Sequence, residues 1–267
     1  LGELEDTWVQ KALLAERAGY DGVDIKACHG YLIAELLSAR ERQHSEYGGA
    51  SLESRGRFYL NIIKKLQRAV KGSEMIVTTR LGVYDGHPFP HGFGVKETKE
   101  VLSPAPVDLT EQLALIKKLR ELGVRMINIS AGNPHHQPFI TRPYDIPVKG
   151  ASKPPEHPLI GVNRILKLAI ECKRNSPEDL LFIGSGFSYL RQFAGYIAAG
   201  LIEEGLMDCC GFGRMAFANP SFPRQLFQEG MIKQKKTCIT CSRCSQRMTE
   251  GKNTGCMIRD PLYKKKG

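Results

Sequence analysis

The chain has 267 residues, of which 42% are hydrophobic and 25% charged, a composition that excludes a disordered protein and suffices for one large domain or two small ones. Lys and Arg number 38 and Asp and Glu 28, so the formal net charge is +10. The basic runs at 233–236 and 264–266 hold no interleaved aromatic residues, and no apolar run reaches the roughly 18 residues of a membrane helix. We therefore expect neither nucleic-acid nor membrane binding.

The first predicted elements are a helix over 8–19, which ends at Gly19, and a short strand over 22–25. Beyond a long loop, the hydrophobic periodicity predicts further alternation of helix and strand. The helices are expected at 57–70, 108–123, 162–172 and 192–204, and the strands at 75–81, 125–130, 180–184 and 207–212. Five strands alternating with helices are typical of parallel βα units with right-handed crossovers.

Two α/β folds compete for this pattern. A doubly wound sheet normally has a G-x-G-x-x-G turn after its first strand, and no such turn follows 22–25. A (β/α)8 TIM barrel builds its active site from the loops that follow its strands. The long loops 26–51, 82–106 and 131–158 all follow predicted strands. We therefore predict an α/β chain that carries the C-terminal part of a TIM barrel, about strands 4 to 8. Because residue 1 is Leu rather than Met, we expect the chain to be part of a longer protein.

Four of the eight cysteines gather near the C-terminus in the pattern C-x2-C-x2-C-x11-C, namely Cys238, Cys241, Cys244 and Cys256. Three thiolates with two residues between each pair of neighbours, and a fourth from a returning segment, suit a cubane iron–sulfur cluster. Structural zinc is the alternative, although its sites usually pair two C-x2-C knuckles. Metal-ligating rather than disulfide-bonded cysteines are typical of a reducing compartment, so we expect a cytoplasmic protein.

A second candidate site follows the first predicted strand, in the segment K-A-C-H-G-Y-L that begins at Lys26. His29 and Tyr31 lie two residues apart and can point into one pocket, where they would offer a hydrogen-bond donor and a phenolic proton. A purely structural role for both side chains is the competing interpretation.

Three motifs together resemble a known family. They are the H-G-Y-L segment at 29–32, the run Y-G-G-x-S-x-E-x-R-x-R-F at 47–58, and the cysteine cluster. This combination resembles the Old Yellow Enzyme / NADH:flavin oxidoreductase family, in its iron–sulfur branch with 2,4-dienoyl-CoA reductase and trimethylamine dehydrogenase. The resemblance implies FMN, a [4Fe–4S] cluster on the four cysteines, and NAD(P)H as electron donor.

The resemblance also implies residue roles. His29 would hold the activating oxygen of the substrate, and Tyr31 would protonate the substrate carbon opposite hydride delivery. Arg80 would lie at the N1/C2-carbonyl edge of the flavin, where a fixed cation tunes the ring. The residues implied to hold the flavin phosphate are Ser185, Gly186, Gly213 and Arg214. Lys26 departs from the pattern because ene-reductases have a His there; a cation would still bind a carbonyl or carboxylate oxygen.

The expected function is therefore that of an FMN- and iron–sulfur-dependent oxidoreductase. Its small-molecule substrate would carry an activated C=C bond, as in an enoyl thioester or an enone, or would undergo a related dehydrogenation. Residues 1–232 are expected to form the partial FMN-binding barrel and 233–267 the cluster-binding segment. An electron-donor flavoprotein or FAD domain is the expected partner, and the sequence predicts no oligomeric state. The alternative is a truncated barrel with a structural metal site that acts as a binding or interaction module.

Overall fold

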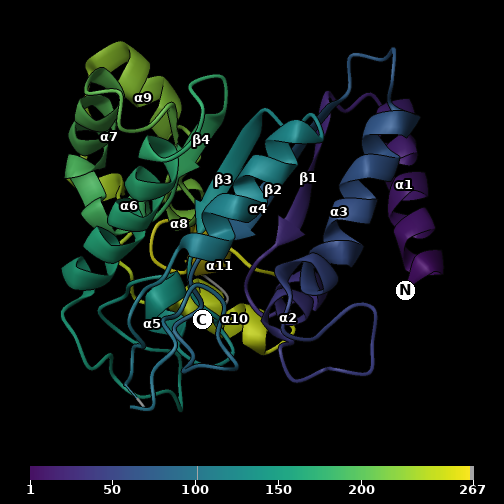
Figure 1. The fold of residues 1–267 in the computed structure, drawn as a ribbon. Coiled ribbons are helices and arrows are strands. Elements are labelled where there is room, and N and C mark those ends of the chain that lie inside the picture. Colours follow the sequence, from purple (N-terminus) through teal and green to yellow (C-terminus); the bar gives the residue numbers. More distant parts are fainter. Residues whose placement is uncertain (101, 265–267) are drawn as a thin grey trace. The chain divides into compact units, whose positions relative to one another are not determined.

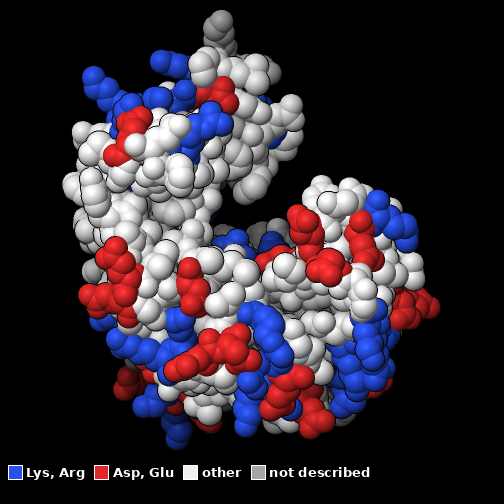
Figure 2. Space-filling view, turned by 90° about the horizontal axis from the view of Figure 1, so that it is seen from above, with Lys and Arg blue, Asp and Glu red and all other residues white. Residues whose placement is uncertain are grey.

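The computed structural model describes residues 1–100 and 102–264, so the basic run at 264–266 lies mostly outside the described residues. The chain divides into two compact units, each described below by itself. The first comprises Leu1–Thr141 and Leu168–Ile183, and the second Arg142–Lys167 and Gly184–Gly267. Within the described residues, the structure contains no helix of the length and apolarity that crossing a membrane requires. On the face seen in Figure 2, basic and acidic side chains lie intermixed over the surface.

A parallel sheet organises the first unit (Figure 1). Its strands follow the order β1-β2-β3-β4, with each strand hydrogen-bonded to the next. Their bounds are Gly22–Ala27, Ile76–Gly82, Met126–Ser130 and Leu181–Gly184. Parallel register pairs Lys26 with Arg80 and Arg80 with Asn128. The parallel α/β class expected from the sequence is confirmed, and all four strands fall within two residues of their predicted bounds.

Helices connect these strands as βα units require. They are α1 (Gly2–Arg17), α2 (Leu32–Ser38), α3 (Leu52–Ala69), α4 (Thr110–Glu121), α5 (Pro138–Thr141) and α6 (Pro158–Arg174). The predicted helix at 57–70 begins earlier, because Ser51 caps α3 by accepting a hydrogen bond from the Ser54 amide at 3.1 Å. The sequence analysis missed α2, whose seven residues are too few to show a helical period.

The core of the first unit lies between the helices and one face of the sheet. Alternate strand residues such as Ala27, Leu81 and Ile127 are fully buried, as are Ile62 and Leu66 of α3. Burial of each large apolar side chain contributes about 2 kcal/mol. The opposite face of the sheet carries the other residues of the alternation, many of them polar and only half-buried. That face and its carboxyl end hold the candidate site.

The second unit packs short helices around an apolar cluster. The buried side chains are Phe187, Ala194, Ala198, Met215 and Ile232. The elements are β5 (Cys209–Cys210), the 3-10 helices η1 (Phe187–Phe193) and η2 (Gln234–Lys236), and the helices α7 (Ala194–Glu203), α8 (Arg214–Ala218), α9 (Phe222–Glu229), α10 (Arg243–Thr249) and α11 (Pro261–Lys264). The strand predicted at 207–212 is thus reduced to two residues. The predicted helix at 192–204 begins only at Ala194, after a 3-10 turn.

Candidate active site

The carboxyl ends of three neighbouring strands bring two cations side by side. Because Lys26 of β1 and Arg80 of β2 are register partners in a parallel pair, their side chains point to the same face of the sheet. Asn128 continues this row on β3. Lys26 and Arg80, which lie far apart in the sequence, are therefore placed together by the sheet register.

His29 is held beside this row by an unusual backbone. Its φ of 66° lies in the left-handed region, which is uncommon for a residue other than glycine, and Gly30 follows with a φ of 68°. Its Nε2 lies 2.7 Å from the hydroxyl oxygen of Ser130, at the end of β3. Burial, together with the charges of Arg80 and Lys26, lowers the pKa of His29 to about 3. The imidazole is therefore neutral at physiological pH and acts as one donor and one acceptor.

Tyr31 lies over Lys26 at the start of α2. The Lys26 Nζ is 3.3 Å from the centroid of the Tyr31 ring, a cation–π contact. About half of the Tyr31 side chain is exposed, at 52%, so its phenol is accessible from solvent. Lys26, His29 and Tyr31, all of which the sequence analysis named, thus gather at one strand end.

Arg80 is only partly satisfied in this arrangement. Its Nη2 donates to the Ser130 hydroxyl at 3.4 Å, while its buried Nε has no hydrogen-bond partner among the described residues. A buried cationic donor without an acceptor is costly, so this position suits a ligand that supplies one. Ser130, which touches both His29 and Arg80, was missed by the sequence analysis.

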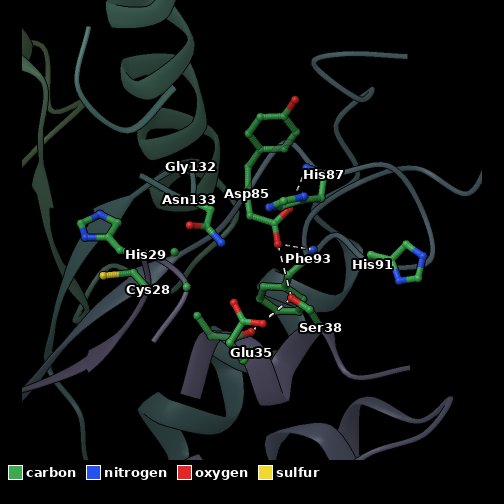
Figure 3. A pocket seen from close by; sticks show the side chains of 14 residues that line it. Cys28, His29, Glu35, Ser38, Asp85, His87, His91, Phe93, Gly132 and Asn133 are labelled. Atoms are coloured by element: carbon green, nitrogen blue, oxygen red, sulfur yellow. Dashed lines mark hydrogen bonds between the residues drawn. The ribbon is translucent and has the colours of Figure 1, made fainter. Parts of the chain in front are cut away.

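A cavity of about 180 Å³ opens next to His29 (Figure 3). Figure 3 shows the Ser38 hydroxyl donating a hydrogen bond to the Asp85 carboxylate, at 3.3 Å, with Glu35 beside Ser38. Asp85 accepts hydrogen bonds from the amides of Phe93 at 2.8 Å and His87 at 3.0 Å. Burial raises the pKa of the Asp85 carboxyl to about 6. The cavity was not predicted, although an Asp shortly after a predicted strand is a recognisable signal.

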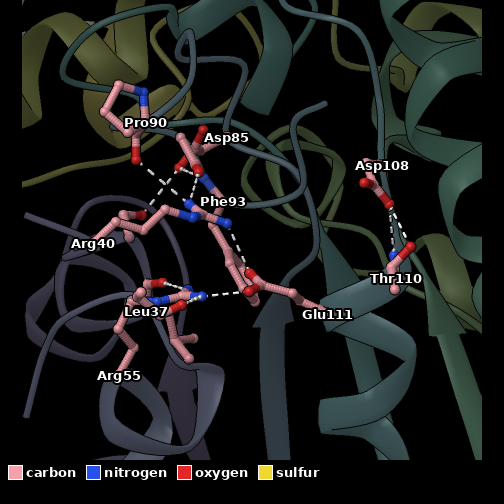
Figure 4. A network of polar contacts seen from close by, with 12 residues as sticks. Leu37, Arg40, Arg55, Asp85, Pro90, Phe93, Asp108, Thr110 and Glu111 are labelled. Carbon is pink, nitrogen blue, oxygen red and sulfur yellow. Dashed lines mark hydrogen bonds and ion pairs between the residues drawn. The ribbon is translucent and has the colours of Figure 1, made fainter. Parts of the chain in front are cut away.

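A buried ion network ties the loops around this cavity together (Figure 4). Arg55, from the Y-G-G-x-S-x-E-x-R run, is fully buried and donates to the carbonyls of Leu37 and Gly49 and to the carboxylate of Glu111. Arg40 donates to the same carboxylate at 2.7 Å and to the Gly92 carbonyl at 2.6 Å. This motif arginine therefore fixes the loops that carry the cavity rather than contacting it.

The residues expected to hold a phosphate lie in the second unit. Gly186 follows β4 with a φ of 98°, a conformation that a side chain would strain. The loops after β4 and β5 are joined because the Met215 amide donates to the Ser188 hydroxyl at 3.1 Å and the Gly211 amide donates to the Gly184 carbonyl at 2.7 Å.

Arg214 stands at the start of the helix that follows the second of these loops. Its Nη2 donates to the Pro143 carbonyl at 2.8 Å, and its buried Nη1 has no partner among the described residues. Ser185 and Gly186 thus lie on one of the two joined loops, and Gly213 and Arg214 on the other. Whether they bind a phosphate stays a prediction.

The four C-terminal cysteines and Arg214 line one small pocket of the second unit. All four are free, half-buried thiols. The Thr240 amide donates to the Cys238 sulfur at 3.4 Å, and the Arg259 amide to the Cys256 sulfur at 3.3 Å. Within residues 1–100 and 102–264, however, no three Cys, His, Asp or Glu side chains converge closely enough to hold a single metal ion.

The fold and the site together define a class of protein, a parallel α/β protein with polar side chains gathered at the carboxyl ends of its strands. Residues 2–184 match the NADH:flavin oxidoreductase / NADH oxidase family. The chain therefore belongs to that family, which confirms the family expected from the sequence.

Individual relatives agree with this assignment. The chain is 26% identical over 240 residues to an NADH oxidase of Thermoanaerobacter brockii, covering 90% of this chain and 31% of the relative. It is 24% identical over 253 residues to a dimethylamine dehydrogenase of Hyphomicrobium sp., covering 94% and 29%. The chain thus spans about a third of the length of the curated relatives it matches.

A solved structure shares the fold. The structure of 2-naphthoyl-CoA reductase in complex with 2-naphthoyl-CoA matches with a TM-score of 0.70 and 20% identity, over 98% of this chain and 34% of that one. At this identity the likeness shows the fold alone. The matched region extends over nearly the whole chain and is not confined to the strands.

Proposed function

We propose that the chain is the FMN- and cluster-binding part of an oxidoreductase that takes electrons from NAD(P)H and reduces an activated C=C bond. The observation that carries this proposal is the group of Lys26, His29 and Arg80 at one strand end, beside the accessible phenol of Tyr31. Membership of a flavin oxidoreductase family and the fold shared with a CoA-thioester reductase support it. A related dehydrogenation, as in the amine dehydrogenase relative, uses the same electron transfer in reverse.

Two unsatisfied donors fit the proposed FMN. Arg80 in the first unit has a buried Nε without a partner among the described residues, and Arg214 in the second has such an Nη1. We propose that Arg80 faces the edge of the flavin ring and that Ser185, Gly186, Gly213 and Arg214 hold its phosphate. A guanidinium near the ring stabilises the negative charge of the reduced flavin, and one near the phosphate forms charge-assisted hydrogen bonds.

The cysteine pocket fits a [4Fe–4S] cluster better than a zinc ion. The ligands of one zinc ion must all approach the same point, and the thiols do not. Each ligand of a cubane binds a different iron, so four cysteines that line one pocket suit a cluster without meeting at a single point. Amides that donate to Cys238 and Cys256 are the kind of contact that tunes such a cluster.

The chemistry assigned to this chain's own residues is binding, polarisation and proton delivery. The bound flavin would supply a hydride. The neutral His29 would donate a hydrogen bond to the activating oxygen of the substrate, where charge develops during reduction. Lys26 would add a cation at a carbonyl, thioester or carboxylate oxygen of the substrate. Tyr31 would donate the proton to the carbon of the C=C bond next to the one that receives the hydride.

The wider organisation is proposed on the same basis. Residues 1–232 would form the C-terminal part of a TIM barrel and 233–267 its cluster-binding extension. The protein would work in the cytoplasm with an electron-donor flavoprotein or FAD domain and a small-molecule substrate. Absence of nucleic-acid binding stays a prediction.

Anaerobic purification followed by absorption spectroscopy and iron analysis tests the proposal. We expect flavin bands, iron and acid-labile sulfide in the wild-type protein. Cys241→Ser should lose iron, whereas Cys209→Ser, at an exposed cysteine outside the pocket, should keep it. A colourless protein that contains zinc would refute the proposal and favour a structural metal site in an interaction module.

A further inference from the structure

Ser130 occupies a position between the two groups that the proposed chemistry uses most. It ends β3 and is 2% exposed. Its hydroxyl oxygen lies 2.7 Å from His29 Nε2 and 3.4 Å from Arg80 Nη2. No motif marks this serine, and its neighbours lie 101 and 50 positions away in the sequence.

The direction of these hydrogen bonds follows from what each group is able to do. A guanidinium has donors only, so the Ser130 oxygen must accept from Arg80. The Ser130 hydroxyl has a single hydrogen to donate, and the acceptor next to it is His29 Nε2. The hydroxyl therefore donates to Nε2, which must then carry no proton. If Nε2 carried the ring proton instead, the oxygen would accept twice and the buried hydroxyl hydrogen would have no acceptor among the described residues, which is costly.

An imidazolium is the other arrangement to consider, since both of its nitrogens would donate. Burial and the neighbouring cations Arg80 and Lys26 oppose it, and they keep the pKa of His29 near 3. The neutral ring with a proton on Nδ1 is the state that satisfies all three groups.

We propose that Ser130 is a positioning residue that receives a hydrogen bond from Arg80, donates one to His29 Nε2, and so fixes the His29 tautomer with its proton on Nδ1. Nδ1–H then becomes the single donor that His29 presents to a ligand. The ligand oxygen that would accept a hydrogen bond from Nδ1–H rests on the proposed function, but the assignment of the tautomer does not.

The backbone supports the same arrangement. The consecutive left-handed residues His29 and Gly30 turn the chain sharply after β1. A Cβ on Gly30 would lie 2.6 Å from the end of the Asn133 side chain, so another residue in this left-handed position would be strained and would displace Asn133. The strand end, the turn and Ser130 thus fix the orientation of the His29 ring together. Removal of the Ser130 hydroxyl should allow both neutral tautomers of His29 to be populated.

Nitrogen-15 NMR of the full chain, with labelled histidine and without flavin or substrate, tests the proposal directly. Long-range proton–nitrogen correlations distinguish the two neutral tautomers from the imidazolium, and the His29 signals are those lost in His29→Gln. At neutral pH we expect the Nδ1–H tautomer of His29 to exceed the Nε2–H tautomer roughly tenfold, because the two differ by about one net hydrogen bond. Ser130→Ala should bring the two tautomers to similar populations, and Ser130→Thr, which keeps the hydroxyl, should restore the excess.

Three results would overturn the proposal: Nε2–H or an imidazolium in the wild type, or an unchanged tautomer ratio in Ser130→Ala. If Ser130→Ala does not fold, Ser130→Cys gives the same decision, because a thiol is only a weak hydrogen-bond donor. The excess of Nδ1–H should then fall, and an unchanged ratio would refute the role of Ser130. Since no cofactor or substrate is present, these outcomes do not depend on whether the proposed function is correct.

Discussion

Replacement of Arg55 by Leu should destabilise the first unit severely. Arg55 is fully buried, and its removal leaves the carbonyls of Leu37, Gly49 and Ala50 without its hydrogen bonds and Glu111 without one of its two cations. An unsatisfied buried acceptor costs about 1–3 kcal/mol, and breaking a buried ion pair costs about 3–5 kcal/mol. Because Leu recovers part of this by apolar burial, we expect a loss of about 4 kcal/mol in the free energy of unfolding, a large part of the total of a typical domain.

Urea denaturation followed by tryptophan fluorescence measures this loss. Trp8 is the only tryptophan, and its ring packs edge-on against Phe58 of α3 at 6.3 Å, so its emission reports on the unit that contains Arg55. The milder Arg55→Lys, which keeps the charge, should lose about half as much. Arg120→Met is the matched control, because its ion pair with Asp179 lies at the surface of the same unit and its loss should leave the midpoint nearly unchanged. A loss below about 1 kcal/mol in Arg55→Leu would show that the network does not fix these loops.

Three further outcomes follow from the site. Tyr31→Phe should slow substrate reduction about 100-fold while flavin reduction stays normal, whereas His29→Ala should weaken ligand binding as well; equal, unimpaired rates in stopped-flow experiments would contradict both roles. Burial raises the pKa of Asp85 from 3.8 to about 6, so the folded state binds this proton more tightly than the unfolded state. The urea midpoint should therefore fall as the pH is raised from 4 to 6, and it should fall less in Asp85→Asn. Gly30→Ala should lower the melting temperature, since the new Cβ meets Asn133; an unchanged melting curve would show that the turn adapts.

The strands were predictable because each is a short apolar run between turn residues. Strand β2 has a burial that alternates residue by residue, and its predicted range of 75–81 differs from Ile76–Gly82 by one position at each end. The helix limits were less accessible, since α3 begins at a Ser51 cap that lies outside its apolar repeat. Strand β5 is limited to two residues because the chain turns at Gly213 into α8, which begins at Arg214.

The candidate site was predictable only where its residues lie close in the sequence. Lys26, His29 and Tyr31 share one strand end, and a local pattern is enough to single them out. Ser130 was not accessible in this way, because its role depends on the register of three strands and on a left-handed turn at His29. Asp85 gains its high pKa from burial, which no sequence pattern reports.

Comparison of FMN with riboflavin binding tests the central claim most directly. Calorimetric titration of both onto the purified chain measures the contribution of the phosphate, which riboflavin lacks. We expect FMN to bind more tightly than riboflavin, and Arg214→Met to remove most of that difference because it removes the proposed phosphate contact. Arg224→Met, at an exposed arginine of α9, is the control and should leave the difference intact. Equal affinity for FMN and riboflavin, or no binding of either, would contradict the assignment of a flavin site to this chain.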